Sequence, residues 1–410
     1  MKKIIIIICR MVIAFTFIFS GFVKAVDPMG FALKIEEYLI SFGMEWFTTI
    51  ALPMAIALIA IEFLLGIYLF IGFHLRIMTP LVLIVMSGFL LLTLYTALFN
   101  PVSDCGCFGD AVKVTNWETF LKNVVLMVFT VGLFYFRKEF NDSESKNLRM
   151  IITAFLCFVY VIGLQIYSYN NLPIIDFRPY KIGTHIASGM TVPKDAEQHE
   201  FETIFIMEKN GERKTFSIEN YPFEDSTWVF IDSETSIIKE GYVPPLQNFM
   251  VLNEDTEDVT YQIVNHRGPL FLMISYNLNK ANKSSIKHFA ELEAIAHQNN
   301  IPFYLLTASD VKTAKKFDLE NNTMFDYLQC DQTTLKTIIR SNPALLLIHD
   351  GTIVGKWHFR NIPEKEIMNN PLSYSVKKLT LKNRNLIIWV NILIIITIPA
   401  IFINRKKSKR

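Results

Sequence analysis

Residues 49–73 read TIALPMAIALIAIEFLLGIYLFIGF and contain one charged side chain, Glu62. As a helix this segment rises about 37 Å at roughly 1.5 Å per residue, enough to cross the ~30 Å hydrocarbon core of a bilayer. Five more segments are of similar character, at residues 4–23, 80–99, 120–136, 150–167 and 386–403. The sequence therefore predicts an α-helical membrane protein with six spans, the fourth of which can be extended upstream through the interfacial aromatic Trp117.

The first segment has features of a secretory signal, because Lys2 and Lys3 precede its apolar run and Ser20 and Gly21 follow it. Its apolar run is too long for a cleaved signal, and no A-x-A site follows. We expect a retained anchor that also directs insertion.

Composition narrows the class of protein. Hydrophobic residues make up 51% of the 410 residues, and the formal net charge is +2. No basic stripe interleaved with aromatic residues occurs, so the sequence gives no indication of nucleic-acid binding.

The basic residues predict the orientation, because cytoplasmic loops retain Lys and Arg. If all six spans alternate, four basic clusters fall on one side, which is then the cytoplasm: Lys2 and Lys3, residues 74–76, residues 137–149 and residues 405–410. The opposite side receives residues 24–46, 100–117 and 168–385. A missed span would invert everything after it and place the last cluster outside, which the charge rule disfavours.

Two of the five cysteines form a close pair, in Asp104-Cys105-Gly106-Cys107-Phe108-Gly109-Asp110. On the outer, oxidising side a Cys105–Cys107 disulfide would close a very small ring, with Gly106 supplying the unusual backbone angles. Such a bond is strained and easily reduced, which predicts a redox centre. Lys113 and the start of the fourth helix are candidates to favour a thiolate.

Two alternatives stay open for this pair. The thiolates could bind a soft metal such as Cu(I), although no Met or His cluster accompanies them, and we therefore predict no metal site. The pair could also be a static staple of its loop.

Glu62 lies near the middle of its span, where an ionised carboxylate normally faces a partner or a water-filled cavity. Arg10, in the first span, is the partner we expect, because its long side chain could reach the level of Glu62. The two residues are candidates for a proton-transfer or quinone site, with a structural ion pair or a neutral buried Glu as the alternatives. We expect most of Lys24, Asp27 and Lys34 to be interfacial anchors.

Several of these residues recur in a known group. The sequence resembles the DoxX/MauE group of four-helix membrane proteins over residues 1–138, through Arg10, Phe19-Ser20-Gly21, Lys24, Asp27-Pro28-x-Gly30, Pro53, Glu62-x-x-Leu65-Gly66 and Asp104-Cys105-Gly106-Cys107-Phe108-Gly109. The resemblance implies a redox function: the DoxX members are linked to quinone-dependent oxidation of sulfur compounds, and the MauE members to disulfide formation during maturation of methylamine dehydrogenase, in methylamine utilisation. It does not imply a particular substrate.

The region after the fifth span, which we place at residues 150–168, divides into two parts before the last span at 386–403. Residues 169–243 alternate apolar and polar side chains around turn signals such as Asn210-Gly211, which predicts a β-rich section. Residues 244–370 predict an α/β domain with strands at 270–275, 303–306, 325–328, 344–348 and 352–357 and helices at 284–298 and 333–339.

This second part resembles the TlpA-like and peroxiredoxin-like thioredoxin domains over residues 244–363. Pro343, directly before a strand, matches the position of their cis-proline, and Asp350-Gly351 matches their final hairpin. Where active members have Cys-x-x-Cys, this sequence has Tyr276-Asn277-Leu278-Asn279-Lys280. Cys330 is expected to be packed and unreactive.

These observations lead to two functional hypotheses. The first is a multi-pass cell-membrane redox protein whose Cys105 and Cys107 exchange electrons with an extracytoplasmic thiol or disulfide partner, with quinone as the candidate cofactor. The soluble domain would then be extracytoplasmic, and periplasmic in a Gram-negative inner membrane. The second is a non-catalytic, membrane-anchored scaffold that binds a partner through the cysteine-free thioredoxin-like domain, so the sequence leaves open whether the protein is an enzyme.

Overall fold

We describe a computed structural model of the chain, which covers residues 2–102, 105–112, 114–140, 148–193, 195–198, 200–223, 225–239 and 241–407, with side chains up to residue 397. Asp104, Lys113 and the basic residues at 405–410 of the sequence analysis lie, in whole or in their side chains, outside this description. Two compact units are present. One combines residues 1–184 with 250–410, and the other comprises residues 185–249.

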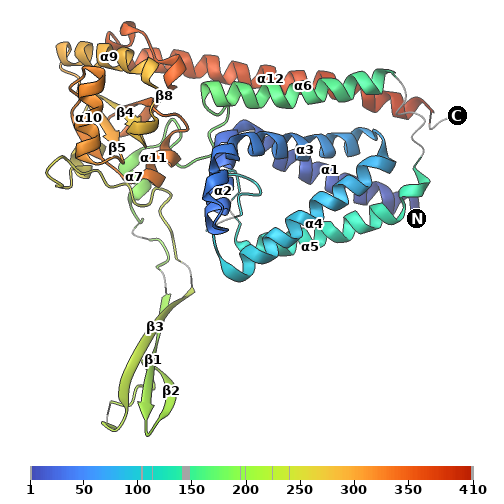
Figure 1. Cartoon of the computed structure of the whole chain (residues 1–410), viewed down its shortest axis with the longest axis horizontal. Coiled ribbons are helices and arrows are strands. Elements are labelled where there is room, and N and C mark those ends of the chain that lie inside the picture. The colour runs from blue at the N-terminus through green and yellow to red at the C-terminus, as the bar shows by residue number, and fades with distance from the viewer. Residues whose placement is uncertain are drawn as a thin grey trace. The chain divides into compact units, whose positions relative to one another are not determined.

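The helical part of the first unit contains the six spans (Figure 1). Six helical segments are long and apolar enough to cross a membrane: Lys2–Val26, Glu45–Ile71, Leu75–Phe99, Asn116–Tyr135, Leu148–Asn171 and Pro371–Thr397. They are formed by α1 (Lys2–Val26), the 3₁₀ helix η1 (Glu45–Ile50) with α3 (Ala51–Ile71), α4 (Leu75–Phe99), α5 (Asn116–Tyr135), α6 (Leu148–Asn171) and the start of α12 (Pro371–Lys407). The predicted six-span helical bundle is confirmed.

The segment after the first span is a helix, which the sequence analysis did not predict. This helix, α2 (Pro28–Ser41), begins because the Asp27 carboxylate accepts a hydrogen bond from the Gly30 amide at 2.9 Å and Pro28 occupies its first turn. It is followed by Gly43 at a positive φ of 70° and then by η1. The cap at Asp27 therefore fixes where the chain turns after leaving α1.

Glycines bring α1 and α3 into close contact. A Cβ on Gly66 would lie 2.7 Å from the Ile18 backbone nitrogen, and a Cβ on Gly21 would lie 2.8 Å from the Phe63 Cα. Small residues allow helix backbones to approach this closely in membranes. The two contacts fix the register of α1 against α3.

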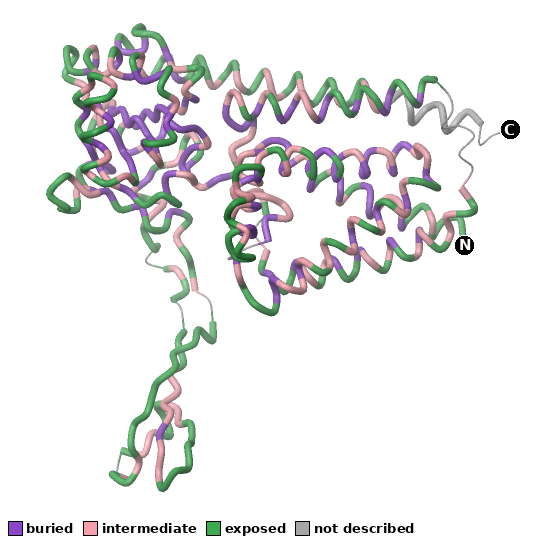
Figure 2. Tube along the Cα trace, viewed as in Figure 1, coloured by how far each residue is buried: buried purple, intermediate pink, exposed green. Residues whose placement is uncertain are grey.

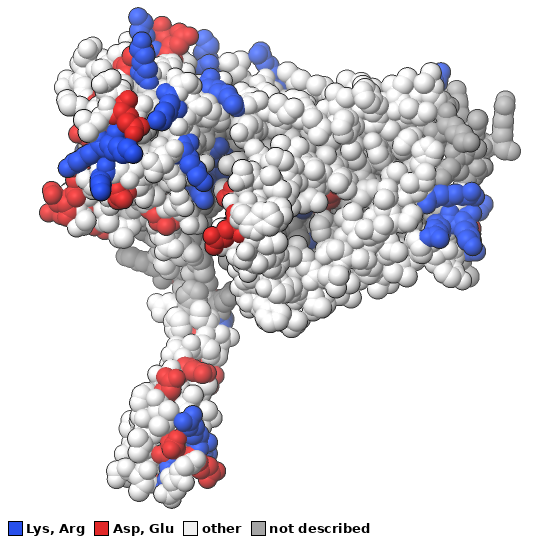
Figure 3. All heavy atoms as spheres, viewed as in Figure 1, with Lys and Arg blue, Asp and Glu red and all other residues white. Residues whose placement is uncertain are grey.

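Charged side chains gather at the ends of the helical part, and its sides in the view of Figure 3 carry almost none. At one end Lys2 pairs with Glu139, and the Arg76 guanidinium donates hydrogen bonds to the carbonyls of Phe140 and Lys138, at 2.6 and 3.3 Å. Three of the four basic clusters therefore meet at one end of the bundle. The fourth, at residues 405–410, lies outside the described side chains.

The α/β domain of the first unit has one five-stranded sheet in the order β6-β5-β4-β7-β8. Strands β4 (Pro269–Ser275), β5 (Phe303–Thr307) and β6 (Tyr327–Gln329) are parallel, and β7 (Ala344–His349) and β8 (Thr352–His358) are antiparallel to their neighbours. The helices are α8 (Thr260–Val264), α9 (Ile286–Gln298), α10 (Val311–Asn321) and α11 (Gln332–Ile338). This is the predicted thioredoxin-like topology, and the Asn342–Pro343 bond is cis.

The core of this domain lies where the sheet meets its helices, around fully buried Phe271, Phe289 and Leu347 (Figure 2). Helix α10 was not predicted, because only Ala314 and Phe317 of its residues are buried and its apolar periodicity is correspondingly weak.

The second unit contains the short helix α7 (Ile186–Met190) and a three-stranded antiparallel sheet in the order β2-β1-β3. Its strands are β1 (Glu200–Lys209), β2 (Glu212–Ser217) and β3 (Val229–Lys239). Asn210 and Gly211 both have positive φ, as a tight hairpin between β1 and β2 requires. Most residues of these three strands are exposed, and among their described residues Met207 is the one buried hydrophobic side chain (Figure 2).

Candidate functional site

The cysteine pair lies in the segment that connects α4 to α5. The Asn116 side chain closes this segment by donating to the carbonyl of Val102 at 3.0 Å and to Asn100 Oδ1 at 3.2 Å. Gly106 has a φ of +65°, and a Cβ there would lie 3.1 Å from the Lys34 side chain, so only glycine fits without strain. The Gly between the cysteines is thus required both by its backbone conformation and by its contact with α2.

Helices α1 and α2 anchor the backbone of the pair. The Ser20 hydroxyl of α1 donates to the Cys107 carbonyl at 2.5 Å, and the Tyr38 hydroxyl of α2 donates to the Cys105 carbonyl at 3.4 Å. The Phe108 ring that follows packs against Phe19 and lies 4.1 Å from the Lys122 ammonium of α5. The cysteines are therefore fixed to three different helices of the bundle.

The two sulfur atoms are 2.7 Å apart, as free thiols, with Cys105 buried and Cys107 half-buried. The hydrogen bond from Cys105 lowers the pKa of Cys107 to about 7 against the opposing effect of burial, and the ammonium groups of Lys122 and Lys24 lower it further. The same hydrogen bond, and then burial, raise the pKa of Cys105. Cys107 is the sulfur that ionises near neutral pH and the more accessible of the two.

The partner of Glu62 is Lys24, and the expected pairing with Arg10 is wrong. Lys24 Nζ donates to Glu62 Oε2 at 2.8 Å, and the two side chains are 4% and 6% exposed. The reason is the helix register: Gly66 faces Ile18, and Arg10 lies eight residues, about 12 Å, further along α1 from that contact. Arg10 Nε is buried without a hydrogen-bond partner among the described residues.

Two of the three expected interfacial anchors also have other roles. Lys24 is buried in the ion pair with Glu62, and Asp27 is a helix cap that also binds Arg340. Lys34 forms an exposed ion pair with Glu37 at 2.9 Å. The correction follows because this segment folds into α2, a helix that the sequence analysis did not predict.

A cavity of about 110 Å³ connects the thiols to the buried ion pair. Its polar lining includes Cys105, Cys107, Lys24, Glu62 and Asn123, and its apolar lining includes the rings of Phe17, Phe31, Phe89 and Phe108. An apolar cavity with a few convergent polar groups is typical of a small-molecule site. Arg10 does not contribute to it, so of the two expected quinone or proton residues only Glu62 lies here.

The donor set of this cavity is compatible with a quinone headgroup. Such a ring needs flat apolar walls and donors for its two carbonyl oxygens; the phenylalanine rings can supply the walls, and Lys24 and Asn123 can supply donors. In the described part of the chain no group of three His, Cys, Asp or Glu side chains could hold a metal ion.

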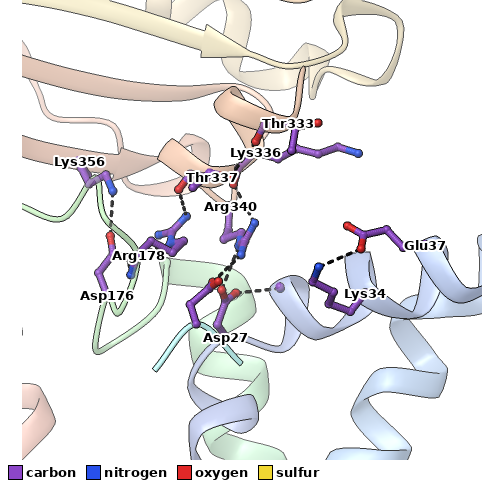
Figure 4. Close-up of polar contacts among 12 residues, drawn as sticks. Asp27, Lys34, Glu37, Asp176, Arg178, Thr333, Lys336, Thr337, Arg340 and Lys356 are labelled. Atoms are coloured by element: carbon purple, nitrogen blue, oxygen red, sulfur yellow. Dashed lines mark hydrogen bonds and ion pairs between the residues drawn. The ribbon is translucent and has the colours of Figure 1, made fainter. Parts of the chain in front are cut away.

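The α/β domain contacts the cysteine loop through one arginine (Figure 4). Arg340 Nε donates to Asp27 Oδ2 and its Nη2 donates to Asp110 Oδ2, both at 2.9 Å, while its Nη1 donates to the Lys336 carbonyl at 2.8 Å. Burial raises the pKa of Asp27, but the charges of Arg340 and Arg178 outweigh it and hold that pKa below its usual value. Arg340 therefore joins the cap of α2, the cysteine loop and the end of α11.

Three more ionic side chains lie beside this arginine (Figure 4). The Asp176 carboxylate accepts hydrogen bonds from Arg178 Nε and from Lys356 Nζ, both at 2.8 Å. Burial and the charge of Arg178 lower the pKa of Lys356 to about 7. The sequence analysis missed Arg340, Asp176, Arg178 and Lys356, because they lie far apart in the chain and belong to no local motif.

Hydrogen bonds hold the segment at residues 276–280, which stands where active thioredoxin domains have Cys-x-x-Cys. The Ser275 hydroxyl at the end of β4 donates to Asn342 Oδ1 at 2.7 Å, and Asn342 Nδ2 donates to the Asn277 carbonyl at 2.8 Å. Cys330 is buried, and burial raises its pKa to about 12. The α/β domain has no thiol available for exchange in its described part.

Together the fold and the site define a multi-pass membrane protein in which a helical bundle with a cysteine pair carries a thioredoxin-like domain without the usual thiols. Residues 2–136 match the family of the methylamine utilisation protein MauE, and residues 201–240 match a domain of unknown function, DUF8463. The chain is also 27% identical over 156 residues to the protein TlpB of Flavobacterium psychrophilum. That alignment covers 36% of this chain and 42% of TlpB, so the chain spans less than half the length of this relative. The resemblance to MauE and to a thioredoxin-like protein is confirmed.

Proposed function

We propose that the protein is a membrane thiol–disulfide oxidoreductase that uses Cys105 and Cys107. One observation carries the proposal: two free thiols in direct contact, of which the more accessible has a pKa of about 7, line a cavity inside a MauE-like bundle. A structural staple gains nothing from an acidic, accessible thiol, whereas thiol exchange depends on one.

The exchange step follows from the unequal thiols. The Cys107 thiolate attacks a disulfide of a partner protein, so that a bond forms between Cys107 and the partner and the partner's own S–S bond breaks. Cys105 then loses its proton and attacks the Cys107 sulfur, which releases the second partner thiolate and leaves the pair oxidised. Two electrons pass to the partner, and the reverse sequence oxidises a partner dithiol. The direction depends on the two reduction potentials.

For net oxidation of partners, the reduced pair must pass its electrons on. A quinone bound in the cavity would accept two electrons and two protons. Lys24 and Asn123 would hold its oxygen atoms, the phenylalanine rings would exclude water, and Cys105 and Cys107 would border the ring. We include the extracytoplasmic position of the site in the proposal, because three basic clusters meet at one end of the bundle, and Lys and Arg mark the cytoplasmic side.

Trapping tests this proposal. In Cys105→Ser the resolving thiol is gone, so Cys107 should retain a partner in a mixed disulfide, visible as a reducible band shift in non-reducing gels of whole membranes. Cys107→Ser is the matched control and should trap nothing. A membrane-impermeant maleimide added to intact cells should label Cys107 if the loop is extracytoplasmic. Absence of any mixed disulfide in Cys105→Ser, while a known exchange protein is trapped, would refute the proposal.

The scaffold hypothesis retains one supporting observation: residues 276–280 contain no cysteine, and Asn342 binds the backbone carbonyl of Asn277 there. It predicts that Cys105→Ala with Cys107→Ala leaves partner binding and the cellular phenotype unchanged. Lost activity with intact binding would exclude it.

A further inference from the structure

Lys24 and Glu62 reach the same cavity as the thiols, although they are distant from the cysteines in the sequence. Lys24 lies one turn after Ser20, whose hydroxyl binds the Cys107 carbonyl, so a single face of α1 contacts both the cysteine loop and Glu62. The Lys24 ammonium also lies 4.8 Å from the centre of the Phe31 ring and 5.7 Å from that of Phe89. Its position is fixed from three sides.

Stability alone does not explain such a pair. Transferring both charges out of water costs about as much as their attraction returns, and apolar residues of similar size are often as stable. A buried ion pair beside a thiol also acts on the thiol, because an opposite charge nearby favours the thiolate and a like charge opposes it.

We infer, on the basis of the proposed function, that Lys24 is a positioning residue whose ammonium stabilises the Cys107 thiolate. Glu62 holds Lys24 in place and reduces the effect of its charge on that thiolate. The two act in opposite directions on Cys107: the ammonium favours the thiolate and the carboxylate disfavours it. The pair therefore contributes to how much of Cys107 is ionised at a given pH, and so to how fast it exchanges, beside the larger effects of Cys105, burial and Lys122.

Other charged and titratable groups face the cysteine loop and belong to the same balance. Cys105 shares a hydrogen bond with Cys107 within the loop, Lys122 approaches from α5, and Lys34 of α2 lies against Gly106. Asp110 follows in the loop and is bound by Arg340. These groups stay in place when Lys24 or Glu62 is substituted. A change in the ionisation of Cys107 can therefore be assigned to the substituted residue.

The test is the pH profile of Cys107 alkylation in the full, reduced protein in lipid nanodiscs, with iodoacetamide and quantification of the modified peptide by mass spectrometry. Lys24→Met should slow alkylation at pH 7 about 10-fold and shift the profile to higher pH, as expected for loss of one nearby cation. Glu62→Gln should shift the profile in the opposite direction and speed alkylation at pH 7. Lys24→Arg should restore most of the rate lost in Lys24→Met.

Arg10→Met is the matched control, because it removes a cation from the same helix but outside the cavity, and its profile should equal that of the wild type. If Lys24→Met and Glu62→Gln shift the profile in the same direction, or not at all, the inference is wrong and the pair is structural. Capture of a partner by Cys105→Ser with unchanged profiles would sink this inference alone. Opposite shifts without capture would leave it standing and count against the proposed function.

Discussion

Arg340→Gln removes the guanidinium that joins the thioredoxin-like domain to Asp27 and Asp110. Asp27 and Arg340 are only 17% and 10% exposed, and removing one partner of a buried pair typically costs about 3–5 kcal/mol because the other charge stays buried. Asp110 is 36% exposed, so solvent screens its pair, which adds at most about 1 kcal/mol. We expect a local loss of about 3 kcal/mol, since the new amide can still bind one carboxylate.

Hydrogen exchange of the protein in nanodiscs measures this loss, because amide exchange reports the free energy of local opening. The Gly30 amide, bound to Asp27, and the Gly109 amide, bound to the Gly106 carbonyl, should exchange about 100-fold faster in Arg340→Gln, since each ~1.4 kcal/mol is a factor of ten. Adding Asp27→Asn should recover part of the loss by removing the stranded charge.

The matched control is Arg213→Gln, which breaks an ion pair of similar length, 3.0 Å, whose side chains are 67% and 34% exposed. Such exposed pairs contribute about 0–1 kcal/mol, so exchange at Gly30 and Gly109 should not change. Equal exchange in Arg340→Gln and the wild type would refute the reasoning that this arginine fixes the cysteine loop to the α/β domain.

Two further predictions concern packing and pH. Gly66→Ala should destabilise the solubilised protein by about 1–3 kcal/mol, because the new Cβ would meet the Ile18 backbone at 2.7 Å. Gly88→Ala is the control and should not destabilise it, because a Cβ there meets nothing within 4 Å. Equal melting temperatures of the two variants would contradict the close α1–α3 contact. His358 is buried, and burial, with a smaller effect of Arg360, lowers its pKa to about 4 from an ordinary value of about 6.5. The unfolded chain therefore binds the proton first, so stability is complete above about pH 6.5 and about 3 kcal/mol of it is lost as the pH falls to 4 and below. His358→Asn keeps an acceptor for the Arg360 amide and should flatten this part of a pH-dependent unfolding curve; an unchanged slope would show that His358 is not responsible.

The sequence by itself determined the class of structure. Six apolar segments long enough to cross the bilayer core, and an alternation of buried strands with helices, each allow few other folds, because hydrophobic periodicity is local and strong. The Cys-Gly-Cys spacing likewise singled out the pair whose sulfurs lie 2.7 Å apart. Helix α10 was missed because only Ala314 and Phe317 of its residues are buried, which leaves a weak apolar period. Helix α2 was missed although its buried residues have helical spacing.

Only the tertiary structure decided which charges meet. Arg10, Lys24 and Glu62 were all visible as charged residues in or beside apolar helices, but the pairing depends on the register of α1 against α3, which Gly21 and Gly66 set by close backbone contact. Arg340 reaches Asp27 across more than three hundred residues of sequence, and no local pattern carries that information. Ion pairs of this kind arise from packing between elements, and their partners appear only when the elements are assembled.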